Sequence, residues 1–425
     1  MKIDITGKKV GIWGFGAVGK SVLSFVSQFP CTISVCDKRE LNGLEKALLE
    51  GHNARFIPHT LLTQFLEAHD IIIPSPGIAL TAYHDFHEKF IHEVDLFGLN
   101  LKKPTIAVTG SVGKTTTVKL LTHILNKLGI KTLAAGNVGL PLLDAVTQQD
   151  EYDMFVLELS SFQLQYQKLF AADIAVLTNF YPNHLDHHLD NEEYLEAKGQ
   201  LFAHQKKEQV AIIPFSFMDL FWNFTVGQKV FWIGNDSNVN RTKELSDITC
   251  HENWQLIIEV LEHLNLPTDN LKELPKDFEP LADRVELIAT VKGITFYNDS
   301  KSTLTVSTLK AVERFNNPIL FLGGLSKGVD RSVLVKELTE KVKEIICFGK
   351  EAEQLHTFCK NGKIKSSAHA TLEDAFNHCT SSAKAGDVVL FSPAGSSYDL
   401  FKNYIERGKC FKNLVKQFEN KKNAY

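Results

Sequence analysis

The sequence has no apolar stretch near the ~20 residues that a membrane-spanning helix requires, so we expect no membrane interaction. The first five residues, M-K-I-D-I, lack the apolar region of a secretory leader, which favours a cytoplasmic location. Basic residues are not in excess either: 46 Lys and Arg face 50 Asp and Glu, for a formal net charge of -4. This balance gives no electrostatic footprint for nucleic acid.

Cysteine is scarce and scattered. The seven cysteines include no C-x-x-C pair and no metal-ligand spacing, as is typical of a reduced cytosolic protein with structural thiols. Low-complexity segments and short repeats are also absent from the sequence. At 425 residues the chain should contain about three globular domains. We expect a monomer.

Apolar runs of strand length alternate with helical patterns along the chain. Runs this uniformly apolar predict strands buried on both faces, and hence parallel sheets covered by helices. Twelve such strands are too many for one sheet and favour several α/β units. Polar or proline-rich steps near residues 100–104 and 274–281 are candidate boundaries between units. The predicted strands are residues 10–13, 33–36, 71–73, 106–108, 154–157, 174–177, 210–213, 230–233, 294–297, 319–322, 345–348 and 388–391.

A glycine-bearing loop follows the predicted strand 106–108 and precedes an amphipathic helix that should stop at Gly129. This order predicts a nucleotide phosphate site, in which backbone N–H groups and the helix N-terminus face the anion. Lys114 would add a positive charge, and the hydroxyl of Thr115 could reach magnesium. The match to G-x-x-x-x-G-K-[ST] lacks its first glycine, because position 108 is valine. An ordinary glycine turn is the alternative. The predicted ATP-binding residues are Gly110, Ser111, Val112, Gly113, Lys114, Thr115 and Thr116.

A second glycine loop lies after the first strand and has the full G-x-G-x-x-G pattern. The next strand ends at Asp37, where a ribose-binding acid would lie in a dinucleotide site. By itself this pattern favours an NAD-dependent oxidoreductase, but the same turn can bind any phosphate-bearing ligand or serve only to connect strand and helix. The candidate ligand-binding residues here are Gly14, Phe15, Gly16, Ala17, Val18, Gly19 and Asp37, with Ser75, Pro76 and Gly77 after the third strand.

Polar side chains also follow the other strands. Glu158 follows the next strand after the phosphate loop, where a carboxylate is well placed to hold magnesium. His184 follows the strand after that, in a His-rich segment that by itself would be a polar surface turn. Three consecutive strands ending in Thr115, Glu158 and His184 favour a shared site. In the last third of the chain, polar loops at 298–303, 323–328 and 392–399 follow three further strands.

Together these motifs resemble the Mur ligases, which build the peptide of bacterial cell-wall precursors. Residues 109–115 (T-G-S-V-G-K-T) are similar to the family's T-G-x-N-G-K-T, and residues 136–139 (G-N-V-G) to its G-N-I-G. Residues 158–164 (E-L-S-S-F-Q-L) have the form typical of the D-glutamate-adding member. Residues 298–301, 392–394 and Arg407-Gly408 with Phe411 also fit.

The resemblance implies three α/β domains. A Rossmann-like domain (1–100) would bind the UDP substrate, a central P-loop ATPase-type domain (101–282) would bind ATP on a mostly parallel sheet, and a Rossmann-like domain (283–425) would bind the amino acid. The implied reaction joins D-glutamate to UDP-N-acetylmuramoyl-L-alanine through an acyl phosphate, with ATP and Mg²⁺. Lys301, Thr303, Lys327, Ser397 and Tyr404 match D-glutamate-binding positions.

Further roles follow from the resemblance alone. Arg284 and Asp299 match ATP-binding positions, and Asn137 matches a UDP-substrate position. Thr115 and Glu158 would bind one magnesium ion and His184 a second, and Lys198 occupies the position of a carbamylated lysine, which would be a further anionic magnesium ligand. From the residues alone, Lys198 would be an ordinary surface lysine. With Lys198, the implied catalytic residues are Lys114, Glu158 and His184.

Several positions depart from the family pattern. Val112 replaces an asparagine, Asp283 a histidine and Leu304 an asparagine, while residues 394–397 read A-G-S-S instead of A-C-A-S. Residues 251–253 match the adenine-contacting H-N-x-x-N motif only faintly. A related ligase with another amino acid, such as an L-alanine-adding or folylpolyglutamate enzyme, is therefore one alternative. A non-catalytic nucleotide-binding relative is another.

Overall fold

The computed structural model describes residues 4–184, 187–234, 245, 248–269, 271–279, 281–326 and 328–420. Contacts divide the chain into two compact units. The first comprises Met1–Leu245 and His251–Phe278, and the second comprises Ser246–Cys250 and Glu279–Tyr425. Each unit is built from parallel strands and covering helices, and the first contains two sheets.

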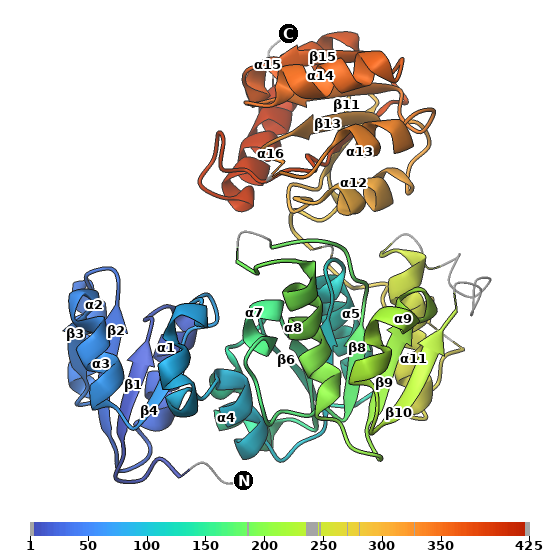
Figure 1. Ribbon diagram of the computed structural model, residues 1–425. Helices are drawn as coiled ribbons and strands as arrows, with labels where there is room; N and C mark the ends of the chain where they lie inside the picture. Colours follow the sequence, from blue (N-terminus) through green and yellow to red (C-terminus); the bar gives the residue numbers. More distant parts are fainter. Residues whose placement is uncertain are drawn as a thin grey trace. The chain divides into compact units, whose positions relative to one another are not determined.

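The N-terminal sheet has four parallel strands in the order β3-β2-β1-β4 (Figure 1). The strand order places the loops after β1, β2 and β4 at one edge, where ligands bind in open α/β sheets. Its elements are β1 (Lys9–Trp13), α1 (Ala17–Val26), β2 (Thr32–Asp37), α2 (Gly43–Gly51), β3 (Arg55–Pro58), η1 (His59–Leu61), α3 (Leu62–Ala68), β4 (Ile71–Pro74), η2 (Thr81–Lys89) and α4 (Glu93–Asn100).

The second sheet has six parallel strands in the order β10-β9-β8-β5-β7-β6. The strand before the phosphate loop, β5, lies between β8 and β7, so the loops after these three strands are neighbours. The elements are β5 (Thr105–Thr109), α5 (Lys114–Lys127), β6 (Thr132–Gly136), α6 (Leu142–Thr147), η3 (Gln149–Glu151), β7 (Met154–Glu158), α7 (Ser161–Leu164), β8 (Ile174–Leu177), α8 (Asn191–Ala203), β9 (Val210–Pro214), η4 (Phe215–Phe217), α9 (Met218–Phe221), η5 (Trp222–Phe224), β10 (Lys229–Ile233) and α11 (His251–His263).

The third sheet, in the second unit, has the order β11-β12-β16-β13-β14-β15, and only its β11–β12 pair is antiparallel. Helices cover both faces. One apolar cluster lies under α12, α13 and α14, and another under α15 and α16. The elements are β11 (Glu286–Val291), β12 (Ile294–Asn298), α12 (Thr305–Val312), β13 (Ile319–Gly323), α13 (Ser332–Glu337), β14 (Glu344–Phe348), α14 (Ala352–Asn361), β15 (Ser366–His369), α15 (Leu372–Ser382), β16 (Val388–Phe391) and α16 (Tyr404–Asn420).

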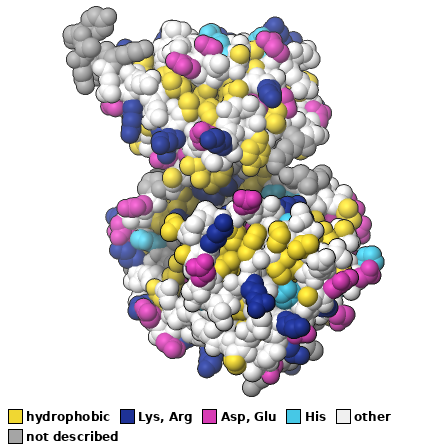
Figure 2. All heavy atoms as spheres, turned by 90° about the vertical axis from the view of Figure 1, so that its left-hand side faces the viewer, with side chains coloured by type: hydrophobic (Ala, Val, Ile, Leu, Met, Phe, Trp, Pro, Cys, Tyr) yellow, Lys and Arg dark blue, Asp and Glu magenta, His cyan; other side chains and the backbone are white. Residues whose placement is uncertain are grey.

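The expected α/β class with parallel sheets is confirmed, and each of the twelve apolar runs is a strand. Four further strands, β3, β6, β11 and β15, were not predicted. All four lie at sheet edges, where one side lacks a neighbouring strand and partly exposed or polar residues are tolerated. The described part of the chain contains no helix that is both long and apolar enough to cross a bilayer. Acidic and basic side chains are interspersed on the face drawn in Figure 2.

Candidate active site

The phosphate loop runs from the end of β5 at Thr109 to the start of α5 at Lys114. Gly110 (φ 142°) and Gly113 (φ 87°) have backbone angles that favour glycine. A Cβ atom on Gly110 would also collide with the Thr178 hydroxyl. The segment therefore has the predicted order of strand, glycine-bearing loop and helix. Thr115 and Thr116 are the second and third residues of the helix and are partly exposed.

Val112 is held through its backbone. Its N–H donates to Asn179 Oδ1 (2.9 Å), while its carbonyl accepts from Asn179 Nδ2 (3.0 Å) and Thr178 Oγ1 (2.7 Å). Asn179 is 4% exposed and follows the neighbouring strand β8. The side-chain amide of Asn179, which follows β8, therefore holds the phosphate loop at Val112. Position 112 is where the family resemblance predicts an asparagine within the loop itself.

Two lysines meet at one carbonyl of the loop. Lys114 Nζ donates to the Gly110 oxygen at 2.7 Å, and Lys198 Nζ donates to the same oxygen at 2.9 Å. Lys198 is 1% exposed on α8 and lies 4.5 Å from the centre of the Tyr194 ring. Its burial, and then the positive charge of Lys114, hold the Lys198 pKa well below its ordinary value, although Glu158 opposes the shift. Lys198 is therefore a buried residue that contacts the phosphate loop and not a surface lysine.

Glu158 ends β7 beside this loop and is 2% exposed. Its Oε1 accepts from Asn137 Nδ2 at 2.9 Å, whereas its buried Oε2 has no hydrogen-bond partner among the described residues. The next residues form a capping box, in which the Ser160 hydroxyl and the Gln163 side chain bond each other's backbone N–H. The E-L-S-S-F-Q-L motif thus starts helix α7 and leaves the carboxylate at the strand end.

His184 lies after β8 in a left-handed conformation (φ 58°). Phe162 contacts its ring at 4.9 Å, and also contacts the rings of His187 at 4.4 Å and His188 at 5.7 Å. His188 Nε2 lies 2.9 Å from Ser161 Oγ. The loop with His184 is therefore joined to the first turn of α7, directly after Glu158.

The described residues contain no group of three or more His, Cys, Asp and Glu side chains able to hold a metal. The predicted magnesium ligands are not all His, Cys, Asp or Glu side chains. They include a threonine hydroxyl and a modified lysine in addition to Glu158 and His184. The unpartnered Glu158 Oε2 supplies the anionic oxygen that a magnesium ion prefers.

The start of α11 also lies against the phosphate loop. Asn253 is 4% exposed, and a Cβ atom on Gly113 would approach its Oδ1 to 2.8 Å. Residues 251–253, which match the adenine motif faintly, thus begin a helix that lies beside the phosphate loop, and their contact with adenine stays a prediction.

In the N-terminal sheet, the loops after β1, β2 and β4 meet. The Asp37 carboxylate accepts from Phe15 N–H (2.6 Å), and Ser75 Oγ donates to the Gly14 carbonyl (3.2 Å). Gly14 adopts φ 94°, and Gly16 and Ala17 are exposed. Arg39, which the sequence did not single out, donates to the Phe15 carbonyl at 2.8 Å. Its guanidinium is held by Glu45 through two hydrogen bonds of 2.7 and 2.8 Å. Val18 and Gly19 lie in the first turn of α1, and Pro76 and Gly77 follow β4.

In the second unit, Arg284 lies between two residues with left-handed backbones, Asp283 (φ 59°) and Val285 (φ 47°). This conformation is unusual for a β-branched valine. The turn is held by the Asn298 amide, which donates to Asp283 Oδ1 at 2.6 Å, and by Val285 N–H, which donates to Asp299 at 3.2 Å. Asp283 thus has a structural partner at the position where the resemblance predicts histidine.

Asp299 is buried, and its carboxylate also accepts from the hydroxyls of Ser302 and Ser392. Burial raises the pKa of Asp299 to about 6, although both hydroxyl bonds lower it. The Asp299 carboxylate therefore joins the ends of β12 and β16 to the Arg284 turn.

Two of the residues predicted to bind the amino acid are in contact. Lys301 Nζ lies 3.9 Å from the centre of the Tyr404 ring. Ser397 is 3% exposed in the loop after β16, and Thr303 is partly exposed after β12. Lys327 lies outside the described residues.

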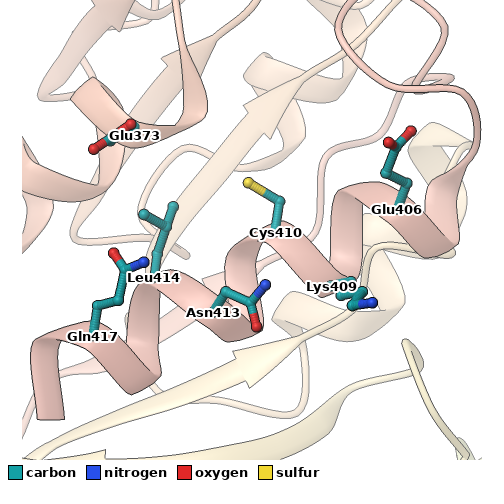
Figure 3. A pocket seen from close by; sticks show the side chains of 7 residues that line it. All are labelled: Glu373, Glu406, Lys409, Cys410, Asn413, Leu414 and Gln417. Carbon is teal, nitrogen blue, oxygen red and sulfur yellow. The ribbon is translucent and has the colours of Figure 1, made fainter. Parts of the chain in front are cut away.

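A separate hollow of about 340 Å³ lies on α16 and α15 (Figure 3). It is lined by Glu373, Glu406, Lys409, Cys410, Asn413, Leu414 and Gln417. None of these seven is a predicted site residue.

Comparison with models of known protein families identifies the family of this chain. The model of the Mur ligase middle domain matches residues 108–262, and that of the Mur ligase glutamate ligase domain matches residues 283–395. The chain belongs to the Mur ligase family.

Two curated Mur ligases illustrate how far the similarity extends. The UDP-N-acetylmuramoylalanine–D-glutamate ligase of Oleidesulfovibrio alaskensis is 34% identical over 95% of this chain and 92% of its own. The ligase of the same name from Acidobacterium capsulatum is 33% identical over 97% of both chains. Among solved Mur ligases, the UDP-N-acetylmuramate-alanine ligase of Thermotoga maritima shares the fold. It has a TM-score of 0.57 and 15% identity over 96% of this chain and 99% of its own.

The Mur ligase sites contain several groups that sequence reasoning missed. Asn179 and Arg39 each bond a glycine-bearing loop but belong to a neighbouring strand end. Asn179 follows a predicted strand, and this position was the sequence signal that it could contact the phosphate loop. Tyr194 gave no such signal, because its burial beside Lys198 depends on how α8 lies against the sheet.

Proposed function

We propose that this Mur ligase joins D-glutamate to UDP-N-acetylmuramoyl-L-alanine with ATP, in the cytoplasmic synthesis of peptidoglycan precursors. The near-full-length identity with relatives of that name carries the proposal. The E-L-S-S-F-Q-L motif and the ordered phosphate loop support it, because both occur at strand ends where the chemistry requires them. We further propose a monomer with three domains, 1–100 for the UDP substrate, 101–282 for ATP and 283–425 for the amino acid.

The phosphate loop fits ATP. The backbone of residues 110–113 and the N-terminus of α5 would bind phosphate oxygens, and Lys114 would neutralise charge on the transferred phosphoryl group. We assign Thr116, Arg284 and Asp299 to the same nucleotide. Arg284 would be presented by the constrained turn around it.

Magnesium also fits the residues present. Thr115 and Glu158 would hold one magnesium ion, with Glu158 Oε2 as an anionic ligand, His184 would hold a second, and a carbamylated Lys198 would add a further anionic oxygen. Bound magnesium would withdraw charge from the phosphoryl oxygens during transfer. Carbamylation requires a neutral amine that attacks CO₂ and then loses a proton. The lowered pKa of Lys198 supports this step, because it increases the neutral fraction. Asn137 would orient Glu158 in addition to its proposed contact with the UDP substrate.

In the N-terminal domain, we assign residues 14–19, Asp37 and residues 75–77 to the UDP substrate. The polar contacts among the three loops support a preformed pocket edge. In the C-terminal domain, Lys301, Thr303, Lys327, Ser397 and Tyr404 would bind D-glutamate. The two lysine ammonium groups and the hydroxyls of Thr303 and Ser397 suit an amino acid with two carboxylates.

The reaction follows from the weakness of a carboxylate as an acylating agent. The alanine carboxylate would attack the γ-phosphorus of ATP, releasing ADP and forming an acyl phosphate. The amine of D-glutamate would then attack the acyl carbon, and phosphate would leave as the amide forms. The proposed role of Lys114 is to stabilise the charge that develops on the phosphoryl oxygens.

The test is phosphate release by the purified protein with ATP, Mg²⁺ and UDP-N-acetylmuramoyl-L-alanine across a panel of amino acids. We expect stimulation by D-glutamate and little by L-alanine, glycine or L-glutamate. Lys114→Ala and Glu158→Ala should abolish turnover, whereas Lys119→Ala, on the exposed face of the same helix, should not. Absence of D-glutamate stimulation in the wild type would reject the proposal. NADH binding without ATP binding would instead favour the oxidoreductase alternative.

A further inference from the structure

Arg331 is a buried cation in the second unit, 2% exposed, directly before α13. Its guanidinium donates to the Gly323 carbonyl (2.9 Å) and the Gly324 carbonyl (3.0 Å) at the end of β13. The same group forms an ion pair with Glu351. A planar guanidinium binds two carbonyls and a carboxylate in fixed directions, so Arg331 defines the path of the loop after β13.

Glu351 binds both Arg331 and the loop after β13. Its Oε1 accepts from the Ser326 N–H (3.1 Å) and the Ser326 hydroxyl (3.3 Å), while its Oε2 bonds Arg331. The loop is therefore held at Gly323, Gly324 and Ser326 by one ion pair, of which Arg331 is buried and Glu351 is partly exposed. Ser326 immediately precedes Lys327, one of the proposed D-glutamate residues.

Gly395, in the loop after β16, makes room for this cation. A Cβ atom on Gly395 would collide with the Gly323 carbonyl and lie 2.9 Å from Arg331 Nη1. The family resemblance predicts a cysteine at this position. The guanidinium of Arg331 thus borders the space that a side chain at position 395 would require.

The two loops are also joined directly. Leu325 and Ser396 exchange two backbone hydrogen bonds of 2.9 Å, so a shift of one loop must move the other. Ser397, another proposed D-glutamate residue, follows in the chain. A second buried arginine, Arg407, donates to the Gly395 carbonyl (2.9 Å) and to the Ser300 carbonyl (2.7 Å) next to Lys301. Three loops with proposed amino-acid contacts are therefore joined through carbonyls bound by two arginines.

We propose that the Arg331–Glu351 ion pair positions the amino-acid loops and sets the enzyme's affinity for its amino acid. Arg331 acts as a positioning residue through Gly323, Gly324 and Gly395, without touching the substrate. This inference rests on the proposed D-glutamate ligation. It predicts an effect confined to the step that uses the amino acid, which a general loss of stability would not produce.

The experiment compares wild type, Arg331→Gln, Arg331→Lys and Glu351→Gln in full-length protein. For Arg331→Gln and Glu351→Gln we expect the KM for D-glutamate to rise at least tenfold, with the KM values for ATP and the UDP substrate within twofold of wild type. Arg331→Lys should not restore affinity, because a lysine cannot bind both carbonyls and Glu351 in the guanidinium geometry. Lys341→Gln is the matched control, since it removes an exposed ion pair with Glu313 in the same unit.

Formation of the acyl phosphate, the first step of the proposed reaction, provides a second measurement. Acyl phosphate trapped by hydroxylamine without D-glutamate should form at the wild-type rate in all variants. A KM for D-glutamate within twofold of wild type in Arg331→Gln and Glu351→Gln would overturn the inference, as would equal loss of trapping and turnover. If Arg331→Gln does not fold, Glu351→Gln, which keeps the size of the side chain, decides by the same criteria. A wild type that traps acyl phosphate but shows no response to D-glutamate would overturn the proposed function and this inference with it.

Discussion

Asn179→Ala tests how the phosphate loop tolerates valine at position 112. The substitution removes two hydrogen bonds to the Val112 backbone, of 2.9 and 3.0 Å. The Val112 carbonyl keeps its bond from Thr178, whereas its N–H loses the Asn179 partner. At about 1 kcal/mol per neutral hydrogen bond, the expected loss is about 2 kcal/mol. If this energy holds the loop in its ATP-binding form, the affinity for ATP falls about 30-fold.

The assay is titration calorimetry of ATP with each variant, together with thermal unfolding. Asn126→Ala is the control, because it removes three hydrogen bonds at the other end of α5, to Thr122 and Thr132. It should lower stability and leave ATP affinity within twofold of wild type. Asn179→Asp should bind ATP more weakly still, because it sets a carboxylate against the Val112 carbonyl. Unchanged ATP affinity in a folded Asn179→Ala protein would refute the assigned role of Asn179.

Three further predictions concern stability, pH and modification. Gly408→Ala places a Cβ atom against the Asp283 carboxylate, so chemical denaturation should show a loss of about 1–3 kcal/mol despite the better helix propensity of alanine; a gain in stability would contradict this contact. Burial raises the pKa of Glu93 from 4.5 to about 7, so the folded state keeps a proton that the unfolded state releases in that range. The contribution of the protonated Glu93 side chain to the free energy of unfolding is therefore full below pH 4.5 and is lost as the pH rises through 7, a decrease of up to about 3 kcal/mol. Glu93→Gln should flatten this part of the pH–stability curve. Activity should fall in CO₂-depleted buffer and return with bicarbonate if Lys198 is carbamylated, and a rate independent of CO₂ in fully exchanged protein would reject the modification.

The sequence predicted the parts of the fold that depend on short segments. Strands buried on both faces are uniformly apolar, which is why the interior strands were found. The edge strands β3, β6, β11 and β15 lack that pattern, and β11 adds the antiparallel pair that no apolar run indicated. The phosphate loop was predicted for a similar reason: the glycines, Lys114 and the helix that follows are contiguous in the chain.

The partners of that loop are distant in sequence, so they could not be predicted in the same way. Asn179 is 67 residues from Val112, and Lys198 is 88 residues from Gly110. Whether Lys198 lies on the surface or beside the phosphate loop depends on the packing of α8 against α7 and β5. From the residues alone, the surface was the better interpretation, and only the resemblance suggested the site.

The sequence alone therefore determined the twelve apolar strands, the phosphate loop and the carboxylate at the end of β7, because each is specified by neighbouring residues. The tertiary structure decided which side chains hold those loops. Arg331 and Gly395 illustrate the difference, since a guanidinium and a missing Cβ become related only when the loops after β13 and β16 lie side by side. Hydrophobic periodicity and backbone freedom are local properties, whereas burial, shared carbonyls and shifted pKa values arise from contacts that the folded chain creates.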